Sequence, residues 1–104
     1  MSDDEAMVRL IFLSYLEDWD PSLLRLKKAV ADKDASSVRR EAHSLKSIVS
    51  AIGDEEFSLL FRSIEMDAMT GVFPNENEFE RMNDMFFQTK KFILEVYPDL
   101  LSGK

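Results

Sequence analysis

The stretch Glu41-Ala-His-Ser-Leu-Lys-Ser-Ile-Val-Ser-Ala-Ile-Gly53 decides the fold, because its apolar residues recur at the spacing of a helix. The repeat begins just before the stretch, at intervals of four, three, four and three residues, and comprises Val38, Ala42, Leu45, Val49 and Ile52. This spacing places apolar side chains on one face of an amphipathic helix, where they can pack against a core. The helix is expected to end at Gly53, because glycine readily adopts the left-handed conformation that ends many helices.

The only histidine of the chain, His43, lies off this apolar stripe. At about 100° per residue it is roughly 140° from Val38, so its side chain is expected to point away from the core. The residues on the same side of the helix are Arg39, Lys46, Ser47 and Ser50. Cations one turn away on either side disfavour an imidazolium, and a neutral, exposed imidazole can act as a nucleophile. The alternative is an ordinary surface histidine.

The segment before this helix is also predicted to be helical. Residues 4–31 carry apolar side chains at spacings of three or four, and Pro21 lies within them. The apolar register continues through Pro21, so we prefer one long helix that is kinked near Trp19. The alternative is two helices, with Asp20 as the N-cap and Pro21 at the first helical position of the second.

Three N-cap residues mark the starts of the remaining helices. Asp34 and Asp54 are typical N-caps, and Asn75 is followed three positions later by a glutamate, as in a capping box. The apolar side of the last helix is expected to contain Phe79, Met82, Phe86, Ile93 and Val96. Four amphipathic helices with short connections predict an all-α fold, an antiparallel up-down-up-down four-helix bundle.

Composition limits the classes of function. The 104 residues correspond to one domain spanning residues 1–104. No cysteine and a single histidine argue against a disulfide framework and against a zinc site. A net charge of −7 argues against nucleic-acid binding, and no apolar run reaches the roughly 18 residues of a membrane span. We expect a cytoplasmic monomer with no cofactor, no metal and no membrane association.

Three short motifs resemble one protein family. The run from His43 to Ser47, with Gly53 ten positions after the histidine, resembles the His-x-x-Lys-Gly … Gly signature of histidine-containing phosphotransfer (HPt) domains. Residues 64–71 resemble the Leu-Glu-x-x-Ala-x-x-Gly end of the family's next helix. The upstream positions that match are Phe12, Leu26, Ala29 and Asp34. The resemblance covers residues 5–72, and it departs from the family at Ser47, where the family has glycine.

This resemblance implies a phosphorelay intermediate rather than an enzyme. His43 would accept a phosphoryl group and pass it to or from an aspartate of a receiver domain in a two-component pathway. The catalytic carboxylates and Mg²⁺ would belong to the partner, which would be the receiver domain of a response regulator, a hybrid sensor histidine kinase, or both. The alternative is an HPt-like module that binds a receiver or kinase without relaying phosphate, and Ser47 in place of the family's glycine leaves this alternative open.

Roles for individual side chains follow from the resemblance and the helical spacing. Lys46, one turn from His43, is suited to stabilise phosphoryl charge. Glu65 either accepts a hydrogen bond from Nδ1–H of His43, which leaves Nε2 free, or is simply solvated. A hydrolase-like site is disfavoured, because Ser44 points about 100° away from His43 and no glycine-rich loop follows.

A partner-docking surface is expected around the histidine. Its polar members are Arg39, Ser47 and Ser50, and its apolar members are the off-stripe residues Leu10, Leu13, Leu59 and Met66. Apolar residues away from the core stripe either form an exposed patch for a partner or are buried by a second neighbouring helix.

Overall fold

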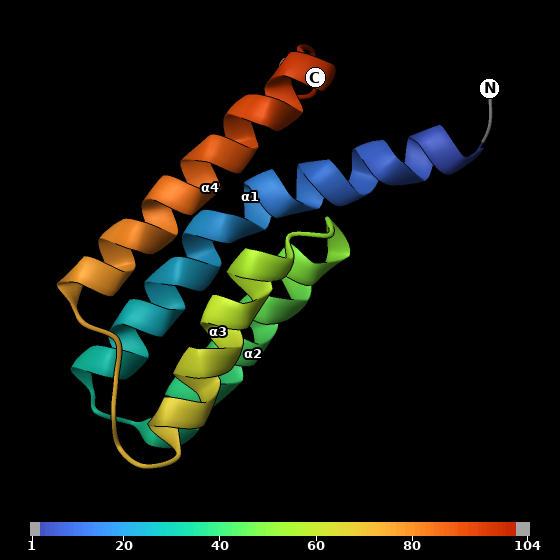
Figure 1. Ribbon diagram of the computed structural model, residues 1–104. Coiled ribbons are helices and arrows are strands. Elements are labelled where there is room, and N and C mark those ends of the chain that lie inside the picture. The colour runs from blue at the N-terminus through green and yellow to red at the C-terminus, as the bar shows by residue number, and fades with distance from the viewer. Residues whose placement is uncertain (1–2, 102–104) are drawn as a thin grey trace.

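A computed structural model describes residues 3–101, which form four helices and no strand (Figure 1). The helices are α1 (Asp3–Ala31), α2 (Ala35–Ala51), α3 (Glu55–Ala68) and α4 (Glu76–Val96). The prediction of an all-helical fold with four helices is therefore confirmed for these residues. None of the helices in this range is both long enough and apolar enough to cross a membrane.

The N-cap residues begin their helices as predicted. The side chains of Asp34 and Asp54 each accept a hydrogen bond from the backbone N–H three residues further on. Asn75 and Glu78 form a reciprocal capping box at the start of α4. Gly53 follows α2 with a φ of +80°, a conformation that costs glycine little because it has no Cβ.

Helix α1 is one continuous helix that contains Pro21, so the alternative of two separate helices is wrong. Trp19, Leu23 and Leu26, on both sides of the proline, are all buried. Continuous burial on one face outweighs the backbone hydrogen bond that proline cannot donate.

The core joins all four helices through the predicted stripe and an aromatic cluster. The stripe residues Val38, Ala42, Leu45 and Val49 of α2 are completely buried. Trp19 of α1 stacks on Phe86 of α4 with ring centroids 4.7 Å apart, and it also packs against Phe57 of α3 at 5.3 Å. A hydrogen bond of 3.3 Å from Thr89 to Asp54 adds a polar link between α4 and the start of α3.

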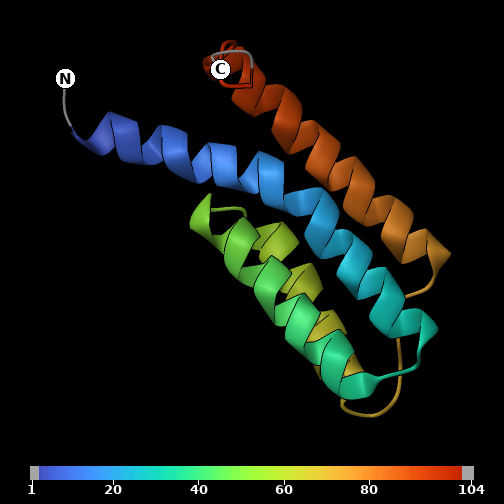
Figure 2. The same cartoon turned by 180° about the vertical axis from the view of Figure 1, so that it is seen from behind.

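The end of α4 differs from the sequence prediction. Val96 was expected on the core side of the helix, but its side chain is 51% exposed, so that prediction is wrong. Figures 1 and 2 both show the last turns of α4 extending beyond the turn between α2 and α3, where fewer neighbours remain. Tyr97, just after the helix, packs against Phe12 of α1 instead, with ring centroids 5.8 Å apart.

Candidate functional site

His43 lies in the middle of α2, and its imidazole points outward. The side chain is 61% exposed, whereas the neighbouring stripe residues Ala42 and Leu45 are completely buried. The ring is nevertheless held in place, because Nδ1 lies 3.1 Å from Oε2 of Glu65 on α3. The sequence prediction that Glu65 lies beside His43 across the α2–α3 pair agrees with this geometry.

Glu65 contacts two basic groups of α2 at once. Its Oε1 accepts a hydrogen bond of 3.0 Å from Nζ of Lys46, and its Oε2 faces the imidazole. Partial burial alone would raise the pKa of the Glu65 carboxyl. The hydrogen bond and charge of Lys46, followed by the contact with His43, outweigh burial, so the pKa lies below its usual value. Glu65 is therefore ionised at neutral pH.

This arrangement selects one tautomer of His43. An ionised carboxylate only accepts hydrogen bonds, so the contact with Glu65 requires a proton on Nδ1. In a neutral ring the other nitrogen, Nε2, then carries the lone pair. The site therefore presents an exposed imidazole with an oriented, nucleophilic Nε2 and an ammonium group one helical turn away.

The serines beside His43 are engaged in contacts of their own. The hydroxyl of Ser47 donates a hydrogen bond of 3.2 Å to the backbone oxygen of His43, so it is turned toward the helix. The hydroxyls of Ser50 on α2 and Ser58 on α3 lie 2.8 Å apart. Arg39 is exposed one turn before His43. These side chains border the histidine without covering it.

The apolar residues predicted to dock a partner fall into different surroundings. Leu10 of α1 lines a shallow pocket of about 340 Å³ that Ser47 and Ile48 of α2 also line. Leu13 is half-buried and packs against the core. Leu59 and Met66 are exposed on α3. The pocket at Leu10 and Ser47 therefore continues the surface that begins at His43.

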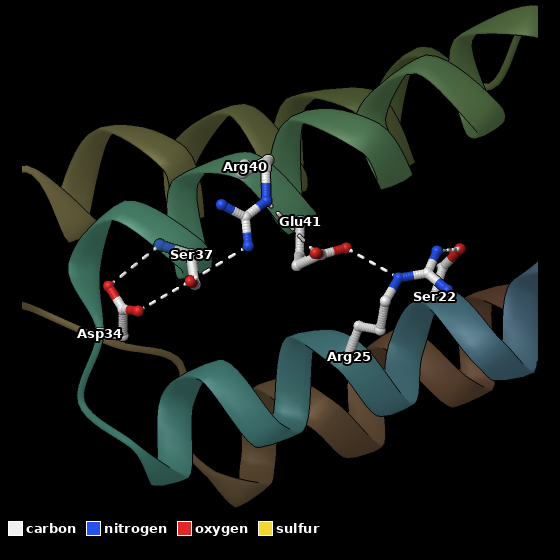
Figure 3. A network of polar contacts seen from close by, with 6 residues as sticks. All are labelled: Ser22, Arg25, Asp34, Ser37, Arg40 and Glu41. Carbon is white, nitrogen blue, oxygen red and sulfur yellow. Dashed lines mark hydrogen bonds and ion pairs between the residues drawn. The ribbon is translucent and has the colours of Figure 1, made fainter.

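A second carboxylate on α2, Glu41, was missed by the sequence reasoning (Figure 3). Its side chain is buried, and its oxygens contact Nε of Arg25 at 3.1 Å and Nε of Arg40 at 3.6 Å. Arg25 also donates to the hydroxyl of Ser22 on the same helix, α1, so the contact between Arg25 and Glu41 is the one in this network that links α1 to α2. A signal existed, because Glu41 lies three residues after Val38 and directly beside Ala42, at the edge of the apolar stripe.

Comparisons with known proteins find no match to this chain among family models, curated proteins or solved structures. Among residues 3–101, no group of three or more histidine, cysteine, aspartate or glutamate side chains is arranged to hold a metal ion. A functional proposal for this chain therefore rests on the geometry around His43 together with the motif resemblance.

Proposed function

We propose that this protein is a phosphorelay intermediate of the HPt class that carries a phosphoryl group on Nε2 of His43. The observation that carries the proposal is the contact between Nδ1 of this exposed imidazole and Glu65, at 3.1 Å. That contact fixes the proton on the inner nitrogen and directs the lone pair of Nε2 outward. A phosphate carrier needs such an accessible, oriented nucleophile and little other machinery.

The transfer step involves His43 and Glu65 of this chain and an aspartyl phosphate of the partner. The lone pair of Nε2 attacks phosphorus, an N–P bond forms, and the bond between phosphorus and the aspartate oxygen breaks to release a carboxylate. The proton on Nδ1 stays in place, so the ring becomes positively charged. Glu65 stabilises this charge through its ionised carboxylate. Transfer in the other direction reverses each change.

Lys46 supplies positive charge for the phosphoryl oxygens. Its ammonium has three N–H donors, and the contact with Glu65 uses one of them. The side chain is 26% exposed and shares Glu65 with His43, and we propose that its remaining donors contact a phosphoryl group on Nε2. Glu65 thus positions both the nucleophile and the cation.

The proposed partner is the receiver domain of a response regulator or of a hybrid kinase. A receiver domain, alone or as part of a hybrid sensor histidine kinase in the cytoplasm, would dock over His43 and the pocket at Leu10 and Ser47. The Mg²⁺ and carboxylates of that receiver would supply the catalysis.

We also propose an antiparallel up-down-up-down bundle with α1 kinked near Trp19. The order of contacts supports the α2–α3 part, since Ser50 meets Ser58 near the turn while His43 meets Glu65 further from it.

The test is phosphotransfer from phosphorylated receiver domains of the same cell to the purified protein. We expect acid-labile label on the parent protein and none on His43→Gln, since the chain has no other histidine. The substitution is at an exposed position, so the free energy of unfolding should change by no more than about 0.5 kcal/mol. Acid-labile labelling of a folded His43→Gln protein contradicts the assignment.

The second candidate function is a binding module that docks the same partners without carrying phosphate. It is favoured by Ser47, which occupies the position of the family's glycine and adds a hydroxymethyl group beside the imidazole. A parent protein that binds receivers but never becomes labelled identifies this function. Labelling that improves in Ser47→Gly indicates instead a relay that the serine slows.

A further inference from the structure

The six arginines of the chain divide into two groups. Four of them pair with carboxylates, and these are Arg9, Arg25, Arg40 and Arg81. The other two, Arg39 and Arg62, are exposed, and their side chains form no hydrogen bond, ion pair or ring contact within residues 3–101. In a chain with 20 acidic and 13 basic residues, two arginines without a carboxylate partner stand out.

Both of these arginines flank the histidine site. Arg39 precedes His43 by four residues on the same side of α2, and Arg62 precedes Glu65 by three residues on the same side of α3. Residue numbers rise along α2 as they fall along α3, because Ser50 meets Ser58 while His43 meets Glu65. Arg39 and Arg62 therefore lie on opposite sides of the site, roughly 10 Å apart along the helix axes.

The charged side chains between the two arginines do not neutralise their positive charge. Lys46 and Glu65 pair with each other and cancel. The next carboxylate along the same row of α3 is Glu55, seven residues from Arg62, which is roughly 10 Å. This distance exceeds the Debye length of about 8 Å at physiological ionic strength, so Glu55 neutralises Arg62 poorly. The surface around His43 is thus locally positive on a protein with a net charge of −7.

We infer that Arg39 and Arg62 bind acidic side chains at the rim of the receiver's active site and set the orientation in which the receiver docks. The inference rests on the proposed function and adds which residues of this chain recognise that partner. Guanidinium groups suit the role, because their planar donors match a carboxylate and carry a small desolvation cost. Two anchors on opposite sides of His43 fix a direction that a single cation cannot fix. Charges at the rim act mainly on association rate and specificity.

The experiment compares charge reversals that change the net charge equally. Arg62→Glu and Arg39→Glu are measured beside Lys91→Glu, whose lysine is exposed on α4 over the ring of Phe87. The probe is a purified receiver domain that binds the parent protein, and affinity is measured at about 50 and 500 mM salt, with circular dichroism as the folding control. Each arginine reversal should weaken binding at least tenfold at low salt, and Lys91→Glu should change it less than twofold.

The salt dependence of binding identifies the cause of the loss in affinity. The loss in the arginine variants should shrink at high salt, because screening weakens exposed ion pairs. Arg62→Lys should recover part of the affinity. Equal losses in Arg62→Glu and Lys91→Glu, or a loss that salt does not change, overturns the inference. The proposed relay fails separately, when the parent protein binds the receiver and His43 is never labelled.

Discussion

Two glutamates, Glu41 and Glu65, each contact two basic groups, and the side chain of Glu65 is the more exposed of the two, at 24% against 12%. Glu41 is buried between α1 and α2 and contacts Arg25 and Arg40. Glu65 lies at the surface between α2 and α3 and contacts His43 and Lys46. The chemistry of the groups they contact separates them further, since only Glu65 touches an imidazole, a ring whose nitrogen can act as a nucleophile. Similar pairing geometry therefore joins helices at one place and orients an exposed imidazole at the other.

Removal of Glu65 should have the largest effect on the rate of phosphotransfer. Glu65→Ala removes the acceptor for Nδ1–H and the partner of Lys46 together, so the tautomer and the cation are both released. Hydrogen bonds to charged groups contribute about 1.5–3 kcal/mol, so transfer to His43 should slow by about tenfold to a hundredfold. Glu65→Gln keeps an acceptor oxygen for the ring and should lose less. Transfer at the parental rate in Glu65→Ala shows that the carboxylate is merely solvated.

Lys46→Ala should have the next largest effect. It removes one charge-assisted contact to the phosphoryl oxygens and leaves the Glu65 contact with His43 in place, so transfer should slow by about tenfold. The measurement is the rate of label transfer from a saturating phosphorylated receiver. Lys91→Glu, on α4, is a control that should transfer normally. An unchanged rate of label transfer in Lys46→Ala shows that the lysine contributes only to structure or solubility.

Removal of Glu41 should affect stability and spare phosphotransfer. Glu41→Ala leaves two arginines without their carboxylate, but both are more than half exposed, with side-chain values of 56% and 67%. Solvent offsets part of the loss, so the free energy of unfolding should fall by about 1–2 kcal/mol. Urea denaturation measures this change, and Glu41→Gln should lose less. A stable Glu41→Ala protein that no longer transfers phosphate assigns Glu41 to the functional site.

The sequence predicted most of the fold because its signals are local. The N-caps at Asp34, Asp54 and Asn75 and the stripe from Val38 to Val49 depend on residues a few positions apart. Val96 was misplaced because its burial depends on how far neighbouring helices extend, which spacing within α4 does not encode. Helix periodicity gives the side on which a residue lies, but not whether another helix is present there.

The candidate site was predicted in part for the same reason. His43 and Lys46 share one helix, so their proximity follows from helical spacing, and Glu65 was placed near them through the motif resemblance. One partner of Glu41, Arg25, comes from α1 and lies 16 residues earlier, so no local pattern pairs these two side chains. The unpaired state of Arg62 likewise depends on every carboxylate that folding brings near it.

The most direct test of this account is ¹⁵N nuclear magnetic resonance of the His43 imidazole before and after phosphorylation. The chain has a single histidine, so the ring signals need no further assignment. We expect a proton on Nδ1 in the free protein, also in the neutral form of the ring, and a phosphoryl group bonded to Nε2 after reaction with a phosphorylated receiver. A free ring protonated at Nε2, or a phosphoryl group on Nδ1, contradicts the claim that Glu65 orients His43 for phosphotransfer.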